Sequence, residues 1–118
     1  MALVLAVDDS SFQLKAVVRI LESGGHEVFT AKNGQLGLDA FAERKPDLIV
    51  SDLLMPVMDG FEMIEKLQIN NTGVPIVVVS ADIQESTRER VLALGVCEVI
   101  AKPPDKEFLL ATICKALS

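Results

Sequence analysis

Three short stretches of this chain are almost unbroken runs of apolar residues, and they constrain the fold more than any other feature. They are Leu3–Val7, Leu48–Val50 and Ile76–Val79. Runs of this kind, rich in β-branched residues, are typical of strands that are covered on both faces, as in a parallel sheet. A sheet with one face in water would alternate apolar and polar residues instead. The sequence therefore predicts a buried parallel sheet.

Weaker apolar runs and amphipathic stretches complete the pattern. Strands are expected at Leu3–Val7, Glu27–Thr30, Asp47–Ser51, Pro75–Ser80 and Val96–Ala101. Three of the intervening stretches open with a capping-box pattern, which marks the start of a helix. These boxes are Ser10–Gln13, Asp59–Glu62 and Asp82–Glu85. Because strands and helices alternate along the chain, an α/β fold with helices on both faces of the sheet is predicted.

Length and charge limit the possible functions. With 118 residues, we expect a single domain over residues 1–118 with no output domain. The net charge of −6 argues against a nucleic-acid partner, because phosphate contacts need clustered Lys and Arg. No signal peptide or membrane-length apolar stretch is present, so a cytoplasmic protein with no membrane contact is expected. Cys97 and Cys114 fit no metal or disulfide spacing and are expected to be buried.

Polar side chains stand at the carboxyl ends of four of the predicted strands. In chain order they are Asp8, Asp9, Asp52, Ser80 and Lys102. Ligands of open α/β sheets bind at this edge, so these five side chains are expected to lie together. An acidic pair after a strand is by itself usually a helix cap or a solvated turn. Five such residues in this order are hard to assign to chance.

Three carboxylates in one crevice require a cation. Two like charges ~4 Å apart repel by about 4 kcal/mol at an effective dielectric constant of 20. Mg²⁺ held by carboxylates and water is the usual remedy. A lysine and a hydroxyl then complete a phosphate-binding set. Since a carboxylate can itself attack phosphorus and form an aspartyl phosphate, the residues predict a Mg²⁺-dependent phosphoryl acceptor.

At these positions the sequence resembles the receiver domain of bacterial response regulators, including free-standing, chemotaxis-type ones. The resemblance spans nearly the whole chain and is carried by Val7–Ser10, Asp52–Gly60, Val79–Ala81 and Ala101–Pro103. The second motif is the most specific, with Met-Pro and Asp-Gly at the family's offsets. The resemblance implies a doubly wound, flavodoxin-like sheet of five parallel strands in the order 2-1-3-4-5 with five helices. That order is taken from the family, which is itself a standard example of it.

The resemblance also implies a metal site. Asp9 would bind Mg²⁺ directly and Asp8 largely through water. Asp52 would contribute a carboxylate oxygen, and the main-chain carbonyl of Leu54 would be a further ligand. No other cofactor is expected.

The same resemblance implies a signalling switch that catalyses only its own phosphorylation and dephosphorylation. Asp52 would accept the phosphoryl group from a histidine kinase or a phosphotransfer protein. Ser80 would hydrogen-bond that group and Lys102 would pair with it, with the Lys102–Pro103 peptide bond in the cis form. The protein would act as a monomer and switch its binding to a downstream target protein.

Three positions depart from the family's pattern. The aromatic switch residue that usually lies three positions before the lysine is Val99 here, and the chain has no Tyr. The position two after the phosphoacceptor, often polar, is Leu54, and the position two after the hydroxyl is Asp82. The first departure bears on how the switch is read. The other two bear on the lifetime of the phosphorylated state.

Other classes fit the residues less well. A dehalogenase-type phosphatase would have Asp-x-Asp after its first strand, a flavodoxin-like electron carrier would not place two acids beside a phosphate, and a P-loop enzyme needs a Gly-rich Lys-Ser/Thr motif. The alternative that stays open is a receiver-like interaction module that works without phosphorylation. Such a module normally lacks one of the five site residues, whereas this chain has all of them.

Overall fold

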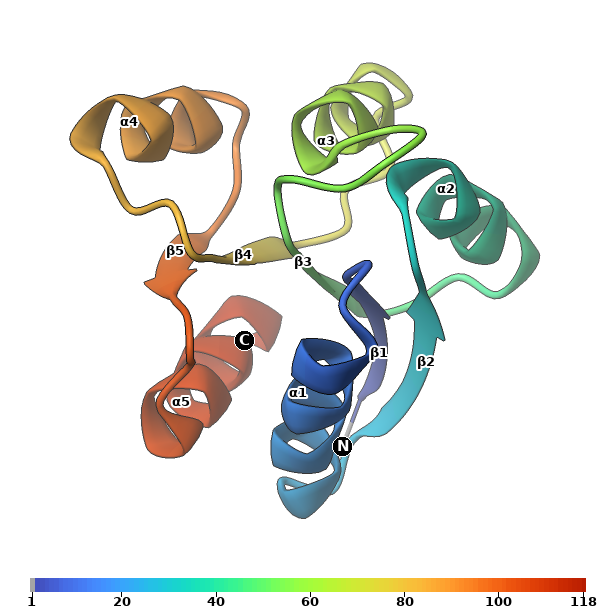
Figure 1. Cartoon of the computed structure of the whole chain (residues 1–118). Coiled ribbons are helices and arrows are strands. Elements are labelled where there is room, and N and C mark those ends of the chain that lie inside the picture. The colour runs from blue at the N-terminus through green and yellow to red at the C-terminus, as the bar shows by residue number, and fades with distance from the viewer. Residues whose placement is uncertain (1) are drawn as a thin grey trace.

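Five parallel strands form the centre of the molecule, and helices cover both faces of the sheet (Figure 1). The computed structural model describes residues 2–118. The strands are β1 (Leu3–Val7), β2 (Glu27–Ala31), β3 (Leu48–Ser51), β4 (Ile76–Ser80) and β5 (Glu98–Ala101). The helices are α1 (Ser11–Ser23), α2 (Gly34–Glu43), α3 (Gly60–Ile69), α4 (Glu85–Ala93) and α5 (Lys106–Leu117).

The strand order is β2-β1-β3-β4-β5, as expected. All neighbours pair in parallel, with Val7 opposite Ser51 and Ser80 opposite Ala101 at the carboxyl ends. After β1, the chain places β2 on one side of that strand. It then places β3, β4 and β5 in succession on the other side. The order therefore reverses between β1 and β3, and this is where open α/β sheets bind their ligands.

The two faces of the sheet carry separate apolar cores. Val4 and Ala6 belong to a core with α1 and α5, whereas Leu5 and Val7 belong to a core with α2, α3 and α4. In Figure 1, α1 and α5 lie on one side of the strands and α2, α3 and α4 on the other. Successive residues of a strand point to opposite faces. The apolar runs are unbroken because both faces are buried.

Two of the three expected capping boxes mark true helix starts. Ser10 accepts a hydrogen bond from the Gln13 amide at 3.3 Å, and Asp59 accepts one from the Glu62 amide at 2.9 Å. The third expectation is wrong, because α4 follows Gln84, which makes no side-chain cap. The Asp82 carboxylate accepts a bond from the Gln84 amide at 3.1 Å, so it closes a local turn before the helix begins.

The expectation that both cysteines are buried is also wrong, since both are exposed. Cys97 lies in a loop because β5 begins at Glu98 rather than at Val96. Cys114 follows the buried Ile113 of α5 and lies on the solvent side of that helix. Among residues 2–118, no helix is long and apolar enough to cross a bilayer.

Candidate functional site

The expected site residues follow the carboxyl ends of β1, β3, β4 and β5. Because the strands are parallel, these residues lie at the same end of the sheet. Parallel pairing continues one residue beyond the strands. The Asp52 amide donates to the carbonyl of Val7 at 2.9 Å, and the Lys102 amide donates to the carbonyl of Ser80 at 3.0 Å. The backbone pairing of the sheet thus fixes the Cα positions from which the Asp52 and Lys102 side chains project.

Three carboxylates form a cluster at this end of the sheet. Asp8, Asp9 and Asp52 each offer an oxygen, and these oxygens lie within 4.8 Å of one another. Asp8 is buried, Asp52 is half-buried and Asp9 is exposed. One oxygen of Asp8 accepts from the Ser10 amide at 2.9 Å, and one oxygen of Asp52 accepts from the Leu53 amide at 2.7 Å. Their orientation is therefore set by the backbone.

Lys102 joins two of these carboxylates. Its Nζ lies 2.8 Å from an oxygen of Asp8 and 2.8 Å from an oxygen of Asp52, and it also donates to the Gln13 side chain. Burial acts to lower the pKa of Lys102, but the hydrogen bonds to Asp52 and Asp8 outweigh it and the pKa is raised. The lysine is therefore charged at neutral pH. Its peptide bond to Pro103 is cis, as expected.

Ser80 links the site to the start of α4. Its side chain is buried, and its Oγ accepts from the Asp82 amide at 3.0 Å. The Asp82 carboxylate accepts in turn from the Thr87 hydroxyl at 2.9 Å, in the first turn of α4. The other oxygen of Asp82 accepts from the Gln84 amide, so both oxygens are hydrogen-bonded to α4 and to the turn before it. Leu54, by contrast, is 67% exposed in the loop after Asp52.

Three residues that support the site were not among the expected site residues. The Ser51 hydroxyl donates to the Asp52 carbonyl at 2.7 Å, and Gln13 accepts from Lys102. A Cβ at Gly60 would lie 2.2 Å from the Asp52 carbonyl oxygen, so only glycine lets α3 begin this close to the site. Gly60 lies inside the Asp-Gly motif and was recognisable. The pattern around Gln13 indicated only a helix cap.

The loop between Asp52 and α3 contains a strained residue. Val57 has a φ of 69°, a left-handed conformation that β-branched residues rarely adopt. The Met58 amide donates to the Pro56 carbonyl at 2.8 Å, which closes a three-residue turn around Val57. The Val57 side chain is 83% exposed, so packing does not offset the strain.

Comparison with known proteins agrees with this geometry. A family model described as the response regulator receiver domain matches residues 4–114. The chain belongs to this receiver family. It is 32% identical to the protein PilH of Pseudomonas aeruginosa, over 100% of this chain and 99% of that protein. It is 37% identical to the chemotaxis protein CheY of Treponema pallidum, over 97% of this chain and 81% of that protein.

The fold of this receiver also matches solved structures. The chemotaxis response regulator CheY4 of Vibrio cholerae superimposes with a TM-score of 0.90 at 34% identity, over 99% of each chain. Receiver domains are signalling switches of two-component systems, and they interact with histidine kinases and downstream effectors. These are the general properties of the family to which this chain belongs.

Proposed function

We propose that this receiver accepts a phosphoryl group from the phosphohistidine of a histidine kinase or phosphotransfer protein on Asp52, and that phosphorylation switches its binding to a downstream protein. The observation that carries the proposal is the position of Lys102, whose Nζ lies 2.8 Å from both Asp8 and Asp52. A cation is thus in place beside the proposed nucleophile. The protein would act as a cytoplasmic monomer and catalyse only its own phosphorylation and dephosphorylation.

The acidic cluster fits a hard divalent cation. Asp8, Asp9 and Asp52 bring only oxygen donors together, which is the donor set that Mg²⁺ prefers. We assign Asp9, Asp52 and the main-chain carbonyl of Leu54 as its direct ligands, with Asp8 holding it largely through water. Bound Mg²⁺ would neutralise the carboxylates and the phosphoryl oxygens as charge develops.

In the proposed transfer, a carboxylate oxygen of Asp52 forms a bond to phosphorus. The phosphorus–nitrogen bond of the phosphohistidine breaks, and its electron pair returns to the imidazole. Lys102 is already charged and within hydrogen-bonding distance of Asp52, so it can pair with a phosphoryl oxygen without a large movement. Positioning and charge neutralisation are the main means by which proteins accelerate phosphoryl transfer.

Ser80 provides the proposed route for reading the phosphorylated state. When the Ser80 hydroxyl turns to a phosphoryl oxygen, the hydrogen bond that its Oγ accepts from the Asp82 amide is altered. Because the Asp82 carboxylate accepts a hydrogen bond from Thr87, this change reaches the first turn of α4. Val99 is 6% exposed in the core and has no ring to reorient. We therefore expect beryllofluoride with Mg²⁺ to shift amide signals more strongly over 80–87 than at Val99. A quiet 80–87 segment would contradict this route.

The direct test is intact-mass analysis after incubation with acetyl phosphate and Mg²⁺. The parent protein should gain one phosphoryl group, and Asp52→Asn should gain none. Asp39→Asn is a matched control, because Asp39 is an exposed carboxylate of α2. Labelling of Asp52→Asn at the parent rate would overturn the assignment. No labelling of the parent protein would favour the phosphorylation-independent module.

A further inference from the structure

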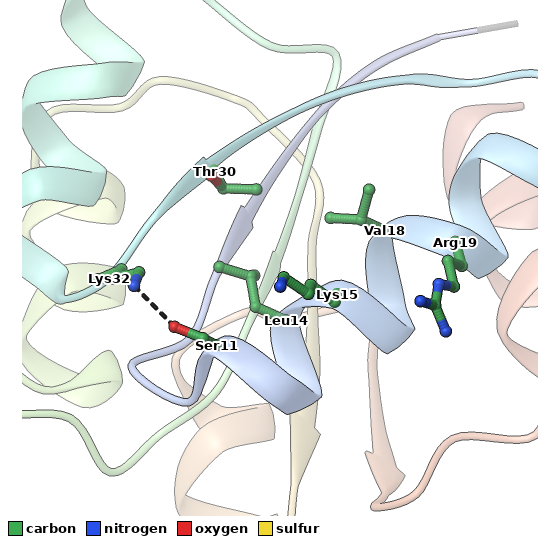
Figure 2. A pocket seen from close by; sticks show the side chains of 7 residues that line it. All are labelled: Ser11, Leu14, Lys15, Val18, Arg19, Thr30 and Lys32. Carbon is green, nitrogen blue, oxygen red and sulfur yellow. Dashed lines mark hydrogen bonds between the residues drawn. The ribbon is translucent and has the colours of Figure 1, made fainter.

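The fold gathers three cations that are not neighbours in the sequence. Lys15 and Arg19 lie on α1 and Lys32 follows β2, and all three line a groove between these two elements (Figure 2). The groove has a volume of about 390 Å³. The buried Leu14 and the half-buried Val18 contribute apolar surface between the charges. We call it the α1–β2 groove.

The cations of the α1–β2 groove have no acidic partners within the described chain. None of the three forms an ion pair with a carboxylate of residues 2–118, and all three are exposed. The Lys32 amino group donates to the Ser11 hydroxyl at 2.7 Å, which Figure 2 shows as a dashed line across one end of the groove. Lys15 and Arg19 are four residues apart on α1, so their charges repel each other. A protein with a net charge of −6 has thus left a local basic site uncompensated.

We propose that the α1–β2 groove binds an acidic segment of a partner protein, one that carries apolar side chains between its carboxylates. Carboxylates would pair with Lys15, Arg19 and Lys32, and an apolar side chain would cover Leu14 and Val18. β2 is an edge strand, so no other strand covers this side of the groove. The site is distinct from Asp52, and the inference goes beyond the proposed phosphoryl transfer.

A protein segment suits the groove better than a nucleic acid does. Binding of single-stranded nucleic acid combines a basic track with aromatic side chains on which bases stack. The α1–β2 groove has three cations and is lined by no aromatic residue of the described chain. The negative charge of the rest of the molecule would repel a long phosphate backbone but leaves a short acidic segment free to engage locally.

Fluorescence anisotropy at about 0.15 M ionic strength, where the Debye length is about 8 Å, tests the proposal with a labelled peptide of glutamates and two leucines. The same peptide with glutamines in place of glutamates is the matched probe. We expect the acidic peptide to bind, and Lys15→Glu/Arg19→Glu to weaken it by about tenfold or more. Lys45→Glu/Lys115→Glu makes the same change in net charge at exposed positions outside the groove. This control should change the affinity by less than about twofold.

Several results would overturn the proposal. These are equal weakening in both double variants, unchanged binding in the groove variant, equal binding of the glutamine peptide, or tighter binding of a short single-stranded DNA to the groove. The groove variant should still accept a phosphoryl group from acetyl phosphate at the parent rate. Loss of peptide binding with intact labelling therefore separates this inference from the proposed phosphoryl transfer.

Discussion

Replacing Lys102 by methionine should destabilise the metal-free protein strongly. Methionine keeps much of the apolar stem but removes the charge that lies 2.8 Å from both Asp8 and Asp52. The lysine side chain is 8% exposed, and the two carboxylates are 7% and 11% exposed. The substitution therefore leaves two carboxylates with little access to water and without a cation.

The magnitude follows from the geometry. At 2.8 Å and an effective dielectric constant of 20, each contact contributes about 6 kcal/mol of attraction before desolvation is counted. Breaking such a buried network by removing one partner typically costs about 3–5 kcal/mol net. For a chain of this length, each kcal/mol lowers Tm by roughly 3–5 °C. Lys102→Met should thus melt about 9–25 °C below the parent protein in EDTA.

Thermal denaturation with and without Mg²⁺ is the assay. Mg²⁺ should raise the Tm of Lys102→Met by more than that of the parent protein, because it replaces the missing charge. Adding Asp52→Asn to Lys102→Met should restore part of the loss. Lys45→Met is the control, since Lys45 is exposed and makes no ion pair with residues 2–118. If Lys102→Met melts within about 2 °C of the parent in EDTA, Lys102 does not hold the cluster together.

Three further predictions concern single residues. Val57→Gly should raise Tm by a few degrees, because relief of about 1–2 kcal/mol of strain at φ 69° exceeds the entropy that glycine adds to the unfolded chain. Gly60→Ala should lower stability by about 1–3 kcal/mol in urea unfolding and slow labelling of Asp52, because its Cβ meets the Asp52 carbonyl. Burial lowers the pKa of His26 below its ordinary value of 6.5. The imidazole therefore binds a proton more readily in the unfolded state than in the folded state. The free energy of unfolding should fall as the pH drops from about 6.5 toward the folded-state pKa. Thermal melts at pH 7.5 and 5.5 should show a smaller loss for His26→Gln than for the parent, and equal losses would contradict this account.

The ends of the strands could be predicted because apolar runs stop where the chain leaves the core. β1 has the expected bounds, and β4 ends at Ser80 as expected. The gathering of acids and lysine at the carboxyl end of the sheet follows from parallel pairing together with the strand order that the resemblance implies. Side-chain partners across the crevice could not be predicted in the same way. The Gln13–Lys102 bond joins positions 89 residues apart, and no local pattern encodes it.

A local sequence pattern gave a wrong prediction where a helix cap and a turn compete for the same side chain. Asp82 matches a helix cap, but its carboxylate closes a turn to Gln84 and binds Thr87, which moves the start of α4. The basic groove was hidden for a different reason. Lys15 and Lys32 come from a helix and from the loop after a neighbouring strand, so charge statistics along the chain do not bring them together.

The pairing of Lys102 with Asp8 also has a consequence for folding, because it joins residues 94 positions apart. By the usual logarithmic dependence, closing a loop of that length costs about 4 kcal/mol of chain entropy before any length-independent term. A chain emerging from the ribosome carries all three carboxylates by residue 52 but gains the lysine only when β5 has been made. If Asp52 is phosphorylated as proposed, competence to receive the phosphoryl group would arise only in molecules whose sheet is complete, which would keep unfinished or truncated chains out of the signalling pool.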